Sequence, residues 1–190
     1  MEALQQHIKK IAGIPAADTR EIASFFRQIQ VKKKENLLRE GMVCGLNYFV
    51  EQGCLRLFFT GHNGTEHTVQ FALENWWLSD YTSFSTQRPS EFYIQAVEPS
   101  TVMVITCQAQ EDMLERFPAM ERYFRLIHQR VHGATQFRMK AMHDQSRKEL
   151  YESFSSRFPE FVQRVPQYLL ASYLGFTPEY LSQLRKKKIS

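Results

Sequence analysis

The sequence predicts an α+β protein in which a many-stranded antiparallel unit, a barrel or sandwich, precedes a long helix and a small helical C-terminal unit. Two observations predict this class. Apolar residues alternate with a period of two between about residues 31 and 107, and recur at helical spacing after about residue 110. The glycines nearly vanish where this period changes. A chain of 190 residues is long enough for one substantial core, or for one core plus a small appended unit.

Two short helices are predicted at the N-terminus. Between about Glu2 and Ile29 the apolar positions recur at helical spacing, and the segment Gly13-Ile14-Pro15 interrupts them. The first residues, MEALQQHIKKIAG, are amphipathic and lack the continuous apolar stretch of a signal peptide. We therefore expect a cytoplasmic protein.

The strand-rich region carries its clearest signal near its middle. Leu55, Leu57 and Phe59 alternate with residues of the opposite face, and Asn63-Gly64 is a strong signal for a tight turn before the next strand, HTVQFAL. Further strands are predicted at YFV, FYIQAV and TVMVIT, because Gly, Asn, Pro and Ser separate them. Several short strands joined by such turns predict an antiparallel barrel or sandwich.

A long helix is predicted from about Gln110 to Ser146, with Pro118 near its start. Apolar residues fall on alternating four- and three-residue steps along it, which predicts a seam that packs against a partner. We predict that this seam forms a homodimer interface, because it is longer than one small barrel can cover. A helix lying on its own barrel is the alternative. The predicted interface residues are Met120, Phe124, Ile127, Val131 and Ala134.

The last part of the chain predicts a helix, a turn and a second helix, which is the spacing of a helix-turn-helix. Ala171 is small enough to let the two helices approach, and Gly175 supplies the positive backbone angle of the turn. Thr177 caps the second helix and Pro178 occupies its first position. Leucines at 174, 181 and 184 would form the small shared core.

The second of these helices carries the predicted DNA-binding residues. Its polar groups can reach base edges, and a run of four basic residues, Arg185 to Lys188, would lie near the phosphates. Residues 138–190 hold 10 Lys and Arg against 5 Asp and Glu, and the rest of the chain holds 14 against 15. The excess positive charge therefore lies in this unit. A merely cationic helix end is the alternative. The predicted contacts are Thr177, Pro178, Glu179, Tyr180, Ser182, Gln183, Lys186, Lys187 and Lys188.

Three stretches carry a family resemblance. They are VPQYLLASYLGFTPEYLSQLRKK, YFVEQGCLRLFF and NGTEHTVQF. Together with the roll and the long helix they resemble the CRP/FNR family of bacterial transcription regulators, whose helix-turn-helix matches A-x-x-L-G-F-T-P-E-Y-L-S. The chain resembles the short variants of this family found among Bacteroidetes, and wing strands after the recognition helix are not expected.

The resemblance covers nearly the whole chain and implies its organisation. The expected fold is a cyclic-nucleotide-binding-like double-stranded β-helix, or jelly roll, followed by a long dimerisation helix and a C-terminal helix-turn-helix. The implied domains are residues 1–109, with the N-terminal helices and the effector-type roll, residues 110–146, the dimerisation helix, and residues 147–190, the DNA-binding domain.

The resemblance also implies an effector pocket, at ENWWLSDYTSFSTQRPSEFYIQA. In nucleotide-binding members a Gly-Glu pair holds the ribose, and an Arg followed by small residues holds the cyclic phosphate. Ser79 and Asp80 stand in place of the pair, and the Glu91 carboxylate would repel a phosphate. We therefore expect that cyclic AMP does not bind in the usual mode. The predicted pocket residues are Trp76, Trp77, Ser79, Asp80, Arg88, Ser90 and Glu91.

The tryptophans of this stretch raise a second interpretation. Indole faces can hold an apolar or aromatic ligand, so an effector other than a nucleotide is a candidate partner. Packing of Trp76 and Trp77 in the core or an interface is the favoured alternative, and the pocket is then closed.

Other chemistries find no support in the sequence. The three cysteines lack CxxC spacing and suit neither a disulfide framework, a zinc site nor an iron–sulfur site. His62, Glu66 and His67 do not have the spacing of a metal-dependent enzyme of barrel fold. No Ser-His-Asp or paired-carboxylate arrangement can be argued, and no apolar run approaches the thickness of a bilayer. We expect no enzyme, no metal, no cofactor and no membrane partner.

The function predicted from these observations is that of a homodimeric transcriptional regulator that binds double-stranded DNA. Its effector domain is altered, and any small-molecule effector is unidentified. The alternative is a sensor that acts through a protein partner and keeps a vestigial DNA-binding head. Gln183 favours this alternative, because an Arg is the family's commonest base-reading residue near that position.

Overall fold

The computed structural model describes the backbone of residues 1–189 and the side chains of residues 1–185. The chain divides into two compact units. The first comprises residues 1–59 and 69–128, and the second comprises residues 60–68 and 129–190. A short hairpin tip from the strand-rich region therefore belongs to the unit that contains the C-terminal helices.

The two predicted N-terminal helices are confirmed as α1 (Glu2–Ala12) and α2 (Ala16–Ala23). Gly13 ends α1 in the left-handed conformation, with φ at 70°. The helical region ends before Ile29, which corrects the prediction, because Arg27–Val31 form strand β1. This strand pairs antiparallel with β8 (Ser100–Thr106), and the backbone hydrogen bonds of that pair outweigh a weak helical spacing.

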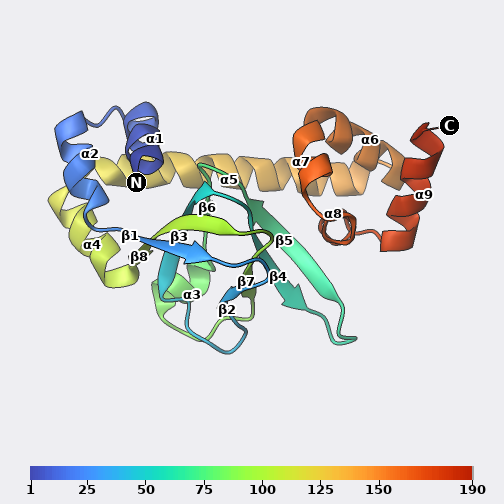
Figure 1. The fold of residues 1–190 in the computed structure, drawn as a ribbon, viewed down its shortest axis with the longest axis horizontal. Coiled ribbons are helices and arrows are strands. Elements are labelled where there is room, and N and C mark those ends of the chain that lie inside the picture. The colour runs from blue at the N-terminus through green and yellow to red at the C-terminus, as the bar shows by residue number, and fades with distance from the viewer. Residues whose placement is uncertain (190) are drawn as a thin grey trace. The chain divides into compact units, whose positions relative to one another are not determined.

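The strands form two four-stranded sheets, so the predicted antiparallel barrel or sandwich is a sandwich (Figure 1). One sheet has the order β1-β8-β3-β6 and the other the order β2-β7-β4-β5. Pairing is most extensive between β3 and β8, where Tyr48 lies opposite Val104. The remaining strands are β2 (Asn36–Leu38), β3 (Leu46–Gln52), β4 (Leu55–Thr60), β5 (Glu66–Ala72), β6 (Trp77–Leu78) and β7 (Tyr93–Ala96).

Two apolar clusters form the core of the first unit. One lies between the sheets and includes Tyr48, Val50 and Ile94. The other lies on the opposite face of the first sheet, where Phe49 and Trp77 pack against the N-terminal helices and against residues 113–127. Successive residues of β3 thus enter different clusters, as the pleat requires. A sheet buried on both faces explains why β3 reads as a nearly continuous apolar run.

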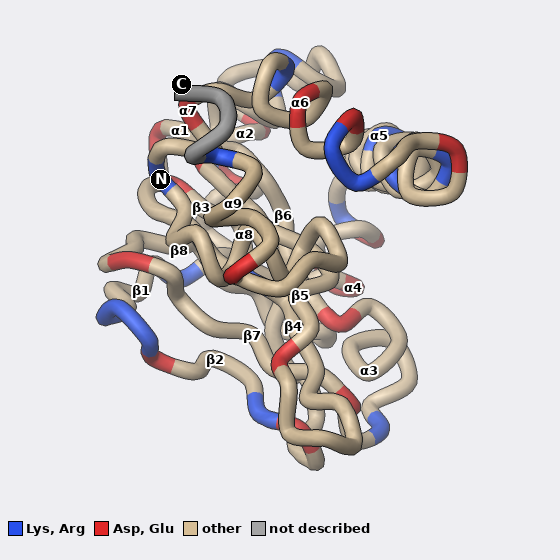
Figure 2. The backbone as a smooth tube through the Cα atoms, turned by 90° about the vertical axis from the view of Figure 1, so that its right-hand side faces the viewer, with Lys and Arg blue, Asp and Glu red and all other residues tan. Residues whose placement is uncertain are grey.

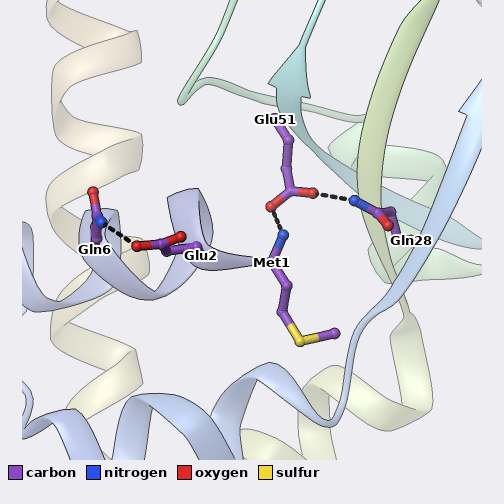
Figure 3. Close-up of polar contacts among 5 residues, drawn as sticks. All are labelled: Met1, Glu2, Gln6, Gln28 and Glu51. Carbon is purple, nitrogen blue, oxygen red and sulfur yellow. Dashed lines mark hydrogen bonds and ion pairs between the residues drawn. The ribbon is translucent and has the colours of Figure 1, made fainter.

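A buried carboxylate ties the start of α1 to the sheet (Figure 3). The Glu51 side chain, on β3, is 8% exposed and pairs with the N-terminal amine of Met1. Gln28 of β1 donates to the other Glu51 oxygen over 2.7 Å. Within α1, Gln6 donates to Glu2 over 3.1 Å. The helix is therefore fixed to the roll by polar contacts as well as by its apolar face.

The predicted long helix is present but divided in two. It begins earlier than Gln110, as α4 (Cys107–Arg116), and continues as α5 (Ala119–Asp144). The break falls at Phe117-Pro118, because a proline cannot supply the backbone N–H that a helix interior needs. A short helix, α3 (Tyr81–Thr86), lies between β6 and β7 in the sequence.

The second unit is built from short helices. These are α6 (Arg147–Arg157), α7 (Pro159–Arg164), α8 (Gln167–Leu174) and α9 (Pro178–Ile189). The sequence did not resolve α7 as a separate helix. A capping box of Ser146 and Glu149 begins α6, and Gly175, with φ at 76°, ends α8 as predicted. No helix within residues 1–189 is both long and apolar enough to cross a membrane.

Candidate functional site

Asp80 is the centre of the predicted effector stretch. It lies at the N-cap of α3 and is 7% exposed. One carboxylate oxygen accepts from the backbone N–H groups of Thr82 and Ser83 at 3.1 and 3.2 Å. The other accepts from the hydroxyl of Ser90 at 2.7 Å. Hydrogen bonds to an ionised acceptor are stronger than neutral ones, so Asp80 joins α3 firmly to the segment before β7.

The polar atoms around Asp80 are satisfied by their neighbours in the chain. The Ser83 hydroxyl donates to the carbonyl of Arg88 and accepts from the N–H of Cys44 at 2.9 Å. The Ser79 hydroxyl donates to the carbonyl of Leu46 at 3.2 Å. Segments 44–46, 79–83 and 88–90 are thereby linked into one internal network. Hydrogen bonds within the chain therefore engage the buried polar groups of this region.

The two tryptophans of this stretch do not converge. Trp77 is 2% exposed and packs against Phe49 and Phe124 at ring-centroid distances of 5.3 and 5.2 Å. Its indole N–H donates to the hydroxyl of Tyr123 at 2.9 Å. Trp76 is 49% exposed. Core packing, the favoured alternative, therefore describes Trp77 but not Trp76.

Arg88 and Glu91 of the predicted pocket are exposed, whereas Ser79, Asp80 and Ser90 are buried. The structure therefore brings together the three small polar residues and leaves both long charged ones at the surface. An exposed Arg88 does not supply a buried cation to this region. Within the described residues, no group of three or more His, Cys, Asp or Glu side chains is arranged to hold a metal ion.

A ring contact that the sequence did not predict joins α3 to α5. Tyr81, the first residue of α3, meets the ring of His128 edge-on at a centroid distance of 4.8 Å. Burial raises the pKa of the Tyr81 hydroxyl and lowers the pKa of His128. Burial favours the neutral form of each group, so this contact is one between uncharged rings. The spacing of 47 residues leaves no local signal from which it could be found.

The five residues predicted for a dimer interface are divided between core and surface. Met120, Phe124 and Ile127 are 0%, 6% and 7% exposed because they pack in the core of their own chain. Val131 is half-buried and Ala134 is exposed. The alternative of a helix on its own roll thus describes the first part of α5. Its later part carries exposed apolar residues, of which Phe137 is 73% exposed.

The helices α8 and α9 present one apolar and one polar face. Leu174 and Leu181 are buried between them, and the backbone N–H of Tyr180 donates to the hydroxyl of Thr177 at 3.3 Å. The exposed face of α9 includes Thr177, Pro178, Glu179, Ser182 and Gln183, and Tyr180 is half-buried. The side chains of Lys186, Lys187 and Lys188 lie outside the described residues.

Aromatic and basic side chains meet around these helices. The guanidinium of Arg138 lies 4.6 Å from the centroid of Tyr173, and that of Arg147 lies 5.7 Å from the centroid of Tyr180. Burial raises the pKa of the Tyr173 hydroxyl despite the opposing charge of Arg138. Figure 2 marks the Lys and Arg positions of the chain in blue, including those along α5. The helical unit is thus held by cation–π contacts that also place positive charge near its surface.

Helix α8 also contacts the hairpin tip of its own unit. The hydroxyl of Ser172 donates to the carbonyl of Glu66 at 2.8 Å and accepts from the N–H of Thr68 at 2.8 Å. Both partners lie on β5, the edge strand of its sheet. The Ser172 hydroxyl therefore pairs with one backbone C=O and one backbone N–H of an edge strand, as a neighbouring strand would. Sequence reasoning missed this contact, because serine at a helix surface carries no such signal.

Residues 28–117 match the family model described as a cyclic nucleotide-binding domain. No curated protein matches the sequence of this chain. The match covers the roll, the Asp80 network and α4, so the strand-rich part of the chain is a domain of the cyclic nucleotide-binding type.

Several solved structures share the fold at low sequence identity. A CooA variant from Carboxydothermus hydrogenoformans has a TM-score of 0.68 at 17% identity, covering 88% of this chain and 78% of that one. FixK2 from Bradyrhizobium japonicum has a TM-score of 0.68 at 13% identity, covering 85% and 83%. The c-di-GMP responsive global regulator CLP of Xanthomonas campestris has a TM-score of 0.70 at 12% identity, covering 91% of each chain. These likenesses establish a jelly-roll β-sandwich followed by a long helix.

Proposed function

We propose that this chain is a homodimeric, DNA-binding transcriptional regulator of the CRP/FNR type, whose roll does not take a cyclic nucleotide in the usual mode. The observation that carries the proposal is the pair α8 and α9. Leu181 is buried on one side of α9, while Ser182 and Gln183 are exposed on the other. A helix that packs one face against its own unit and exposes polar side chains on the other face can enter the major groove of DNA.

The charge distribution supports the same partner. Residues 138–190 carry 10 Lys and Arg against 5 Asp and Glu, so the unit with the exposed polar helix is also the basic one. Positive charge near phosphates raises affinity for any sequence, and the polar side chains then choose among sequences. Among the solved structures of the same fold, CLP is a global regulator that links cell–cell signalling to virulence gene expression.

We propose three functional parts for the chain. Residues 1–109 form the effector-type domain, residues 110–146 the dimerisation helix, and residues 147–190 the DNA-binding domain. The dimer interface begins at Val131 and Ala134 and continues to Phe137, because these residues retain exposed surface on α5. A regulator of this kind works in the cytoplasm and needs neither catalysis, a metal nor a cofactor.

The test is a selection of genomic DNA fragments with the purified chain. We expect enrichment of a short two-fold symmetric sequence, because a symmetric dimer reads two equal half-sites. A matched selection with the double variant Ser182→Ala, Gln183→Ala should retain bound DNA but lose the enriched sequence. Equal enrichment by both proteins would contradict the proposal.

A sensor that acts through a protein partner is the second candidate function. Gln183 favours it, since glutamine at this exposed position lacks the fork of donors with which arginine reads guanine. The same selection separates the two candidates. A chain that is dimeric and folded but enriches no sequence supports the sensor.

A further inference from the structure

Arg138 interrupts the apolar seam of α5. Val131 and Ala134 follow the alternating four- and three-residue steps of that seam, and the next step of four residues falls on Arg138. A guanidinium at this position of a two-fold apolar contact would face its own copy, which is unfavourable. The side chain is half-buried in the structure, so groups of its own chain cover part of it.

The ring of Tyr173, on α8, is the group that Arg138 contacts. The guanidinium lies 4.6 Å from the centroid of this ring. Tyr173 in turn packs against Phe154 of α6, at 5.9 Å between ring centroids. A cation against an aromatic ring is favourable, and more so where water is partly excluded. The contact therefore joins α5 to the first helix of the predicted helix-turn-helix and, through Tyr173, to α6.

A second contact from the same face of α5 reaches the turn between α8 and α9. Met142 follows Arg138 by four residues and therefore lies on the same face of the helix. A Cβ at Gly175 would lie 3.5 Å from the terminal methyl carbon of Met142, so the two residues are neighbours. Gly175 ends α8 and begins the turn. One face of α5 thus contacts both α8 and the turn that leads to α9.

We propose that Arg138 is a positioning residue that holds α8 on α5 and thereby sets the spacing of the two half-sites that a dimer reads. The inference rests on the proposed function, because it needs a homodimer and a DNA partner. Only residues 175–177 separate α8 from α9, so an α8 held on α5 carries α9 with it. Two copies of α5 that pair near Val131 and Ala134 then place two copies of α9 at one separation.

Half-site spacing is the property that such a contact controls. One extra base pair moves a half-site by about 3.4 Å along the duplex and turns it by about 35°. A reading helix that is held firmly cannot follow this change unless the DNA is deformed, whereas a loosely held helix can. The contacts of α9 with a single half-site stay the same. Spacing preference therefore separates a positioning residue from a residue that contacts DNA.

The first experiment measures amide hydrogen exchange of the free protein and needs no DNA. Arg138→Met keeps most of the aliphatic side chain and removes the cation, so the amides of α8 should exchange about fivefold faster. Tyr173→Leu removes the other partner and should also speed this exchange. The double variant should exchange little faster than Tyr173→Leu alone, because both substitutions remove the same contact.

Arg157→Met is the matched control for this experiment. It removes an equal charge from the same unit, and the guanidinium of Arg157 lies 5.5 Å from the centroid of Phe158, in a contact that does not involve α5. We expect the exchange of α8 to be unchanged in this variant. Unchanged exchange in Arg138→Met, or an equal increase in Arg157→Met, overturns the inference.

The second experiment compares two duplexes that carry the selected half-sites, one at the selected spacing and one with a base pair inserted between the half-sites. The unmutated chain should prefer the first by about tenfold, because the second must be twisted to fit. Arg138→Met should bind both within about threefold of each other, whereas Arg138→Lys and Arg157→Met should retain most of the preference. A duplex with a single half-site should bind all four proteins equally.

The two measurements separate this inference from the proposed function. An equal spacing preference in Arg138→Met and the unmutated chain overturns the inference and leaves the proposed function intact. Weaker binding of Arg138→Met to the single half-site, with its spacing preference kept, would make Arg138 a DNA contact and also overturns it. If no sequence is selected, the proposed function and the spacing role fail together, and hydrogen exchange alone decides whether Arg138 holds α8.

Discussion

At the scale of single residues, partial burial between two rings shifts the pKa of His128, although part of its side chain stays exposed. His128 is flanked by the rings of Tyr81 and Phe124, at 4.8 and 6.3 Å between centroids, and its pKa is lowered because burial disfavours the imidazolium. The unfolded chain, in which histidine titrates near 6.5, therefore binds a proton before the folded chain does. Such a group lowers stability as the pH falls.

The variant His128→Phe should lessen the acid sensitivity of the fold. Above about pH 6.5 both states are neutral at this position, and the contribution of His128 is fully present. It is lost as the pH falls through the lower pKa of the folded state. We therefore expect the Tm difference between pH 7.5 and 5.5 to be smaller in His128→Phe than in the unmutated chain. The control His132→Phe removes a histidine one turn further along the same helix and should leave that difference unchanged.

Gln183 is expected to specify DNA sequence, and the three lysines after it are expected to attract DNA of any sequence. Gln183→Ala should weaken binding to the selected sequence by about 1–3 kcal/mol and leave random duplex affinity nearly unchanged. Replacing Lys186, Lys187 and Lys188 by alanine should weaken both and reduce the salt slope by roughly one unit for each phosphate that a lysine no longer neutralises. Fluorescence anisotropy at several salt concentrations measures both effects. Equal weakening on both duplexes for both variants would mean that α9 is only a cationic helix end.

At the scale of elements, α5 has two different surroundings along its length. Its first turns enter the apolar cluster that contains Phe49 and Trp77, so Ile127 is already inside the chain. Substituting Ile127 by a charged residue would damage the fold and could not report on assembly. The exposed Phe137 lies on nearly the same side of the helix as Ala134 and is the better probe.

Phe137→Glu should convert the proposed dimer to monomers. Two glutamates would face each other across an apolar two-fold contact, and removing them from water costs more than the contact provides. Sedimentation at tens of micromolar measures the result. Gln136→Glu, on the opposite side of the helix, adds the same charge and should leave the dimer intact. An unmutated chain that is already a monomer under these conditions would rule out the interface.

At the scale of the whole molecule, a domain of the cyclic nucleotide-binding type is combined with a basic helical unit. The roll has the expected sheets, and Asp80 and Ser90 bond to each other at its effector stretch. The basic excess lies in the other unit. We therefore expect that the chain binds DNA and does not need a cyclic nucleotide to do so.

Calorimetry with cyclic AMP and with cyclic GMP should show no binding at physiological concentrations. The reason is that Ser90 stands where the resemblance places the arginine that holds the cyclic phosphate, and its hydroxyl already donates to Asp80. The same titration with Asp80→Asn separates charge from space, because asparagine fills the position without a negative charge. Low-micromolar affinity of the unmutated chain for either nucleotide would refute this expectation.

The sequence by itself determined the features whose causes are local. Gly13 and Gly175 end helices because each adopts a positive φ, and Pro118 breaks the long helix because it lacks an N–H. Alternation of apolar residues predicted an antiparallel barrel or sandwich. Helical spacing predicted the two N-terminal helices but placed the end of the second one too late. The order of the parts follows from such signals, since each acts within one or two turns of the chain.

The tertiary structure alone decided which residues face the core, the solvent or each other. It buried Trp77 beside an exposed Trp76, placed Met120, Phe124 and Ile127 in the core of their own chain, and joined Asp80 to Ser90. Periodicity shows that a face is apolar but does not show what covers it. A hydrogen bond between distant segments leaves no periodic trace in the sequence. Its formation depends on how the chain packs as a whole, because burial removes the competing water and makes the partner necessary.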